Sequence, residues 1–276
     1  MVKKLKNISQ YNAISQRLIP RYKYASLKLI DKEKISQTLY LMRFKVLENI
    51  GKPFPPQFIM LWVPGYEAIP MSVALFDEDN NALSIVVKPV GPTTNYLVSL
   101  EPGIFMGMYG FLGKPCIPHG KKYLLIGGGS GIAPIMHYTQ YISSHDASAV
   151  IDILYGCWKY EEIGKIPLIL QNYCSSIKTA CFSEHCDYHG TLIDALIKID
   201  LKLYDIIIIA GPPGLLENAL KILKMDEDVL ARVFLVVESM VKCGVGFCGE
   251  CIVKGTNKLL CVDGPCFPAK ELLYVI

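Results

Sequence analysis

Short apolar runs, broken by glycine and proline, fill the chain from about Tyr22 to Lys114. Several short strands with frequent turn residues and little helical periodicity are typical of a small antiparallel barrel or sandwich. The runs that carry this pattern cover residues 37–45, 58–62, 71–76, 83–90 and 103–108. The pattern predicts one helix in this part of the chain, a short one over 95–100.

From Lys121 onward, apolar strand-like runs alternate with segments of helical length. Strands are expected at 123–126, 150–155, 177–182, 205–210 and 233–237, and helices at 133–143, 164–175, 191–198 and 214–224. Strands that alternate with helices indicate βαβ units around a parallel sheet. The predicted fold class is therefore multidomain α+β. It comprises an N-terminal extension (1–21), an antiparallel β-barrel (22–118), a doubly wound nucleotide-binding α/β domain (119–237) and a small C-terminal domain (238–276).

Composition narrows the class of protein. The 276 residues include 51% hydrophobic and 19% charged residues, with 28 Lys and Arg against 25 Asp and Glu. These values exclude a disordered chain and give no basic footprint for nucleic acid. No apolar run approaches the roughly 18–20 residues that a membrane span requires. The N-terminus turns polar after its lysines and lacks the apolar core of a secretory signal, so we expect a cytoplasmic protein.

Cysteines supply the first candidate chemistry. Ten are present, and five of them fall between Cys243 and Cys266. Their spacing is C-x4-C-x2-C followed by a fourth cysteine after nine residues, which is the plant-type [2Fe–2S] pattern. Gly244, Gly246 and Gly249 give the backbone the freedom to loop around a cluster. The predicted ligands are Cys243, Cys248, Cys251 and Cys261.

Two alternatives remain open for this cysteine group. A four-cysteine zinc site is one, although zinc sites usually pair C-x2-C with a second C-x2-C, whereas Cys261 and Cys266 are in C-x4-C spacing. The other is that Cys266 replaces Cys261 as the fourth ligand. A separate grouping of Cys181, Cys186, His185 and His189 is better explained as a solvated loop between a strand and a helix than as a metal site.

Glycine-rich turns follow two of the predicted parallel strands. One glycine turn follows the strand that ends at Ile126 and leads into a helix, an arrangement that lets a pyrophosphate approach bare backbone at a helix N-terminus. It consists of Gly127, Gly128, Gly129, Ser130 and Gly131. A second turn, with Gly211 and Pro212, follows the strand 205–210, and ligands of open α/β sheets bind at such strand ends. A third turn, 155–158, lacks an arginine for a 2′-phosphate, which favours NAD over NADP.

The order of barrel, nucleotide domain and cysteine motif resembles the ferredoxin–NADP reductase superfamily. Within it, the chain is most similar to the iron–sulfur electron-transfer subunits of dihydroorotate dehydrogenase, from about residue 22 onward. The most specific segments are 238–251, Glu-Ser-Met-Val-Lys-Cys-Gly-Val-Gly-Phe-Cys-Gly-Glu-Cys, and 261–267, Cys-Val-Asp-Gly-Pro-Cys-Phe.

This resemblance implies FAD in the barrel. The family's Arg-Pro-x-Ser motif falls on Ile69, Pro70, Met71 and Ser72, so isoleucine replaces the arginine that faces the phosphates. A second flavin segment falls on Val86, Val87 and Lys88, where lysine replaces an arginine. The phosphate turn falls on 91–94, with Thr93 and Thr94. A further departure is Ala210, where a cysteine near the nicotinamide is common.

The resemblance also implies a function in pyrimidine biosynthesis, as the oxidoreductase subunit of a larger complex. Electrons collected on FMN in a separate dihydroorotate dehydrogenase catalytic subunit, in a heterotetramer, would pass through the cluster to FAD and then to NAD or another acceptor. No catalytic nucleophile or acid–base pair is expected. Two alternatives are a reductase subunit of another oxidoreductase, such as a sulfhydrogenase or a ferredoxin-linked NADP enzyme, and a zinc-bearing adaptor without enzymatic activity.

Overall fold

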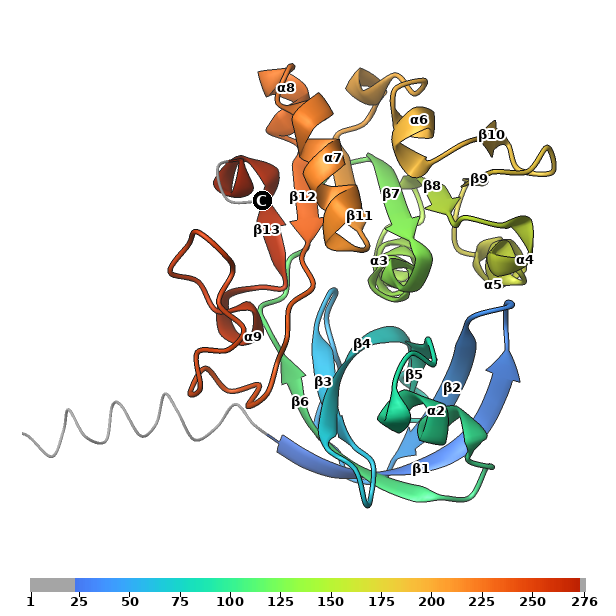
Figure 1. The fold of residues 1–276 in the computed structure, drawn as a ribbon, viewed down its shortest axis with the longest axis vertical. Helices are drawn as coiled ribbons and strands as arrows, with labels where there is room; N and C mark the ends of the chain where they lie inside the picture. The colour runs from blue at the N-terminus through green and yellow to red at the C-terminus, as the bar shows by residue number, and fades with distance from the viewer. Residues whose placement is uncertain (1–22, 274–276) are drawn as a thin grey trace, which may run out of the picture.

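A closed antiparallel barrel forms the first part of the computed structural model, which describes residues 23–273 (Figure 1). Its strands follow the order β1-β2-β5-β4-β3-β6. They are β1 (Lys23–Lys34), β2 (Tyr40–Val46), β3 (Phe58–Trp62), β4 (Ala68–Asp77), β5 (Ala82–Val87) and β6 (Phe105–Leu112). The expected helix is present as α2 (Pro92–Ser99). The expected extension, 1–21, lies outside the described residues.

Strand β1 is a segment that the apolar pattern did not predict. Only its first half alternates, with Ala25, Leu27 and Leu29 buried in the barrel, while its second half is polar. It pairs with both β2 and β6 and thereby closes the sheet on itself. Closure removes the free edges, so a polar strand is stable here because its backbone is paired on both sides.

A seven-stranded sheet forms the second part, in the order β10-β9-β8-β7-β11-β12-β13. The strands are β7 (Lys122–Gly128), β8 (Val150–Gly156), β9 (Ser176–Cys181), β10 (Tyr188–His189), β11 (Ile206–Ala210), β12 (Val233–Val236) and β13 (Cys266–Pro268). All neighbours are parallel except β12 and β13. The strand order reverses between β7 and β11, which confirms the doubly wound prediction and marks the point where ligands bind in such sheets.

Helices cover both faces of this sheet. They are α3 (Ile132–His145), α4 (Tyr160–Ile163), α5 (Ile166–Leu170), α6 (Leu192–Leu196), α7 (Pro213–Leu223) and α8 (Glu227–Leu230), with short 3₁₀ turns η1 (Gly129–Gly131) and η2 (Leu201–Leu203). Helix α3 lies between the sheet and the barrel (Figure 1), and the Gln140 side chain hydrogen-bonds both backbone groups of Phe76 on β4. The helix expected at 164–175 is present but shorter, as α5, and α4 precedes it. Gly164 adopts φ +55°, packs against the barrel segment at Ile35 and separates α4 from α5.

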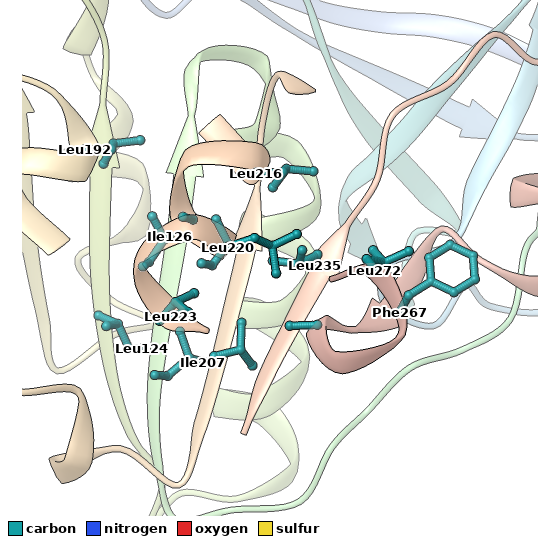
Figure 2. Packing of buried hydrophobic residues seen from close by; sticks show 14 of the residues in the cluster. Leu124, Ile126, Leu192, Ile207, Leu216, Leu220, Leu223, Leu235, Phe267 and Leu272 are labelled. Atoms are coloured by element: carbon teal, nitrogen blue, oxygen red, sulfur yellow. The ribbon is translucent and has the colours of Figure 1, made fainter. Parts of the chain in front are cut away.

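The core beneath α6 and α7 continues into the C-terminal segment. Figure 2 shows leucines of α7 packed against β7, β11 and β12, with Phe267 and Leu272 in the same layer. After β12 the chain leaves the sheet, forms α9 (Leu260–Asp263), returns as β13 and then forms the 3₁₀ turn η3 (Ala269–Leu272). The excursion between β12 and β13 lies beside β6 of the barrel (Figure 1). The domain boundaries stay predictions. None of the helices in residues 23–273 is both long and apolar enough to cross a membrane.

Candidate functional site

The cysteine-rich loop packs directly on the barrel. The Tyr109 hydroxyl, on β6, donates a hydrogen bond to the Cys243 carbonyl at 3.0 Å. Gly244 has φ +67°, and a Cβ on it would approach Leu112 to 2.8 Å and Tyr109 to 3.2 Å. Glycine is required at this position by both the backbone conformation and the close contact.

Backbone N–H groups point at the cysteine sulfurs. Gly246 has φ +76° and donates to the Cys261 sulfur at 3.2 Å. The Cys243 sulfur accepts N–H groups from Val245, Phe247 and Cys248 at 3.4–3.5 Å. Desolvation by itself raises the pKa of the Cys243 thiol, but these donors outweigh it and lower the pKa to about 7. Amide donors around sulfur stabilise thiolates, the form that binds metal.

Cys251 and Cys261 form the buried half of the group. The Cys251 thiol donates to the Cys261 sulfur at 3.3 Å, and both residues are almost fully buried. Burial is the main reason that the pKa of Cys261 rises to about 12. A metal ion deprotonates such a thiol on coordination. Cys243 is half-buried and Cys248 is exposed, so the loop offers two buried and two more accessible sulfurs.

Cys266 is not part of this group. It lies on β13, and its sulfur is paired with that of Cys116 in a disulfide, while Cys181 is likewise paired with Cys186. Neither pairing was predicted from the cysteine spacing. Of the two candidates for the fourth ligand, the structure brings Cys261 next to Cys251. Within residues 23–273, no group of three or more His, Cys, Asp or Glu side chains is arranged so that it could hold a metal ion.

A cavity of about 310 Å³ lies where the barrel, the nucleotide-type sheet and the cysteine segment meet. Its walls are mostly apolar, with a few convergent polar groups, the usual character of a ligand site. Seven of the predicted binding residues line it: Pro70, Met71, Ser72, Val86, Lys88, Thr94 and Ser130. The cavity also reaches Ala210, Leu260 and Pro265. Leu260 immediately precedes Cys261, so the cavity adjoins the cysteine group.

Three other predicted flavin residues face elsewhere. Ile69 packs against the barrel core, and Val87 is fully buried in it. Thr93 is buried and donates a hydrogen bond to Glu67 at 2.6 Å. Thr94 accepts the N–H groups of Val90 and Gly91 at 3.0 and 3.1 Å, which caps α2 beside the cavity. Some residues of the predicted flavin motifs therefore line the cavity, and the others pack within the barrel.

The two glycine turns contact each other at the carboxyl ends of β7 and β11. A Cβ on Gly131 would lie 2.5 Å from the Ala210 carbonyl oxygen and from Gly211 Cα. A Cβ on Gly211 would lie 3.1 Å from the Gly128 carbonyl oxygen. Of the residues predicted in these two turns, Ser130 lines the cavity. The other predicted residues do not line it: Gly127, Gly128, Gly129, Gly131, Gly211 and Pro212.

Glu238 is a candidate residue to which sequence reasoning gave no role. It opens the cysteine motif and lines the cavity, where partial desolvation against the cavity wall raises the pKa of its carboxyl. Glu238 could have been found from its position, because it is the first residue of the segment 238–251 and lies between the last parallel strand and the first cysteine. An acidic side chain at this position places a titratable group against the cavity.

Comparison with known proteins identifies the family. The model of the iron–sulfur cluster binding domain of dihydroorotate dehydrogenase B matches residues 238–273. The probable dihydroorotate dehydrogenase B (NAD(+)) electron transfer subunit of Archaeoglobus fulgidus is 31% identical over 221 residues, which cover 80% of this chain and 88% of that protein. The chain belongs to the family of dihydroorotate dehydrogenase B electron transfer subunits. The Pyrococcus furiosus protein of the same description is 33% identical over 219 residues, covering 79% of this chain and 81% of that one.

Solved structures support the same fold for this dihydroorotate dehydrogenase B-type chain. An NADH-dependent reduced ferredoxin–NADP oxidoreductase, studied for flavin-based electron bifurcation, superposes with a TM-score of 0.78 at 24% identity and covers 89% of this chain and 88% of that chain. The ferredoxin–NADP⁺ reductase from Plasmodium falciparum gives a TM-score of 0.61 at 17% identity, over 77% of this chain and 95% of that one. At these identities the likeness concerns the fold, and the predicted ferredoxin reductase-like architecture is confirmed.

Proposed function

We propose that this chain carries FAD and a [2Fe–2S] cluster and transfers electrons from the FMN of a separate dihydroorotate dehydrogenase catalytic subunit to NAD or another acceptor, in pyrimidine biosynthesis. The assembly is a cytoplasmic heterotetramer. One observation carries the proposal: a single cavity is lined both by Ser72 and Lys88 of the barrel and by Leu260, which adjoins Cys261. The residues for two redox centres thus lie against one another.

The cysteine loop fits a binuclear cluster. Its backbone donors already face two of the sulfurs, and hydrogen bonds to sulfur are one of the means by which a protein tunes an iron–sulfur centre. Each iron of a [2Fe–2S] cluster takes two protein ligands, so a loop in which Cys251 and Cys261 form one close pair suits it. A zinc site would instead gather all four thiols around one ion.

The cavity fits the ring portion of a flavin better than a whole dinucleotide. Its volume of about 310 Å³ is at the small end of the range for ligand cavities. Met71 and Val86 supply apolar surface, and Ser72 supplies a hydroxyl. Lys88 provides a positive charge for a phosphate, and the N-terminus of α2 provides free N–H groups and a partial positive charge.

The positioning residues have distinct tasks. When bound, FAD exchanges single electrons with an iron–sulfur centre and a hydride with a nicotinamide. The apolar cavity wall excludes water from that exchange, and Tyr109 fixes the cysteine loop against the barrel. The touching turns at Gly131 and Gly211 present bare backbone for the pyrophosphate of a dinucleotide at the switch point of the sheet.

An anaerobic visible spectrum, with iron, sulfide and flavin analysis, tests the proposal. We expect about two irons and one FAD per chain. Cys248→Ser should bleach the cluster absorption and leave the flavin spectrum, whereas the matched variant Cys174→Ser, which lies outside the loop, should keep both. A colourless protein that contains zinc and no flavin would refute the function. An unchanged spectrum for Cys248→Ser would refute the ligand assignment.

A further inference from the structure

Two cysteines with no place in the cluster motif meet beside it. Cys116 lies in the connection between β6 and β7, and Cys266 begins β13, five residues after Cys261. Their sulfurs are paired across a sequence separation of 150 residues, and their Cα atoms are 6.1 Å apart. That Cα separation falls within the range found for disulfides, so the pair closes without backbone movement.

Hydrogen bonds hold both cysteines in place independently of their sulfurs. The Cys116 N–H donates to the Pro55 carbonyl at 2.9 Å, and the buried Tyr138 hydroxyl donates to the Cys116 carbonyl at 2.7 Å. On the other side, Cys266 is in register with Val236 of β12. The pair is therefore preorganised by the fold.

The same connection contacts the segment that contains the fourth cluster cysteine. The Gly113 N–H donates to the Cys261 carbonyl at 3.1 Å, and the Lys114 N–H donates to the Gly264 carbonyl at 2.6 Å. A Cβ on Gly113 would lie 2.5 Å from the Gly264 oxygen. Residues 113–116 and 261–266 thus run together, and a bond between Cys116 and Cys266 closes the end of their contact.

We propose that Cys116 and Cys266 form a reversible disulfide that clamps the Cys261 segment to the barrel–sheet connection and slows loss of the cluster. The proposal rests on the proposed function in one respect, the presence of the cluster. Cys116 is half-buried and Cys266 is buried, so Cys116 is the thiol that a small molecule reaches first.

The chemistry is thiol–disulfide exchange with a low-molecular-weight disulfide. The Cys116 thiolate attacks that disulfide and releases one small thiol, and Cys266 then displaces the second. One protein S–S bond forms and one small-molecule S–S bond breaks. The two protein thiols are oxidised, and their two protons and two electrons leave on the two small thiols.

The test follows cluster loss in the full-length holoprotein. Peptide mapping without reductant establishes whether Cys116 and Cys266 are linked after exposure to oxidised glutathione. The decay of cluster absorbance in excess iron chelator is then measured with and without a phosphine reductant. We expect the linked protein to lose its cluster about tenfold more slowly than the reduced protein, because local opening of the segment limits iron release.

Cys266→Ser and Cys181→Ser form a matched pair of variants. Each removes one disulfide, but Cys181 and Cys186 lie at the far side of the sheet, on β9 and the connection that follows it. Purified Cys266→Ser should contain two irons. Its cluster should be lost at the rate of the reduced wild type, and the reductant should not change that rate. Cys181→Ser should behave as the wild type does.

Three outcomes would overturn the clamp. One is free alkylation of both Cys116 and Cys266 after glutathione treatment, and another is a cluster whose loss rate ignores the reductant in the wild type. The third is absence of iron from Cys266→Ser, which would make Cys266 a ligand. Wild-type protein without iron would instead contradict the proposed function, and the peptide map would still report on the cross-link.

Discussion

A single added methyl group tests the contact between the two glycine turns. At Gly131 the φ angle is −61°, an ordinary helical value that alanine adopts without strain. The new Cβ would nevertheless lie 2.5 Å from the Ala210 oxygen and the Gly211 Cα, and both are backbone atoms that no rotamer change can move. Overpacking of this kind costs about 1–3 kcal/mol. Gly131→Ala should therefore lower the free energy of unfolding.

Gly214→Ala is the matched control, since Gly214 lies in the first turn of α7 and a Cβ there meets nothing within 4 Å. Loss of glycine's freedom in the unfolded chain stabilises both variants by about 0.4–1 kcal/mol. The difference between the two variants thus isolates the steric cost at Gly131. Urea unfolding followed by circular dichroism measures it, and Gly131→Ala should also weaken binding of NADH by the flavin-loaded protein. Equal stability of the two variants would refute the close approach of the turns.

Three further results are expected. Lys88→Met should raise the dissociation constant of FAD, measured by flavin fluorescence, about tenfold to a hundredfold, because a charged hydrogen bond is worth about 1.5–3 kcal/mol; Lys88→Arg should not. Burial lowers the pKa of His137 to about 3, and its Nδ1 is the one buried side-chain nitrogen or oxygen without a partner in residues 23–273. The pKa of His137 is lower in the folded protein than in the unfolded chain, so acid favours unfolding: the stability present above about pH 6.5 is lost as pH falls toward 3. At pH 5 the free energy of unfolding should be lower by about 2 kcal/mol for this reason. A difference in unfolding free energy between wild type and His137→Met that does not change with pH would contradict this expectation. Tyr109→Phe should cost about 1 kcal/mol in urea unfolding by removing the hydrogen bond to Cys243, and a stability equal to that of the wild type would show that this bond contributes nothing.

The parallel strands β7, β8, β9, β11 and β12 were predictable from their apolar runs, whereas the two-residue strand β10 was not predicted. The run at β11, Ile206–Ala210, is apolar throughout and gave a strand within a residue of the observed one. In β1, only the first half alternates and the second half is mostly polar, so the apolar period is too short to mark a strand of this length. Its pairing with β2 and β6 comes from barrel closure, which no local pattern encodes.

The candidate site was predictable where a motif is continuous in sequence. The cysteine spacing and the segment with Pro70 and Ser72 identified the loop and one wall of the cavity. The pairing of Cys116 with Cys266 joins residues 150 positions apart, and only the folded chain places them together. Ile69 shows what a motif match alone leaves open, since this position packs partly buried against the barrel core and does not line the cavity.

The antiparallel strand β13 ties the cysteine segment to the sheet, so this segment is not a separate module. Phe267 lies opposite Leu235, and its ring belongs to the same buried layer as the leucines of α7 (Figure 2). A fragment that stops before the cysteine motif would leave β12 as a bare edge and uncover part of that layer, conditions that promote aggregation. The cysteine segment is an insertion between two paired strands of the sheet, so it cannot be separated from the sheet as an independent unit.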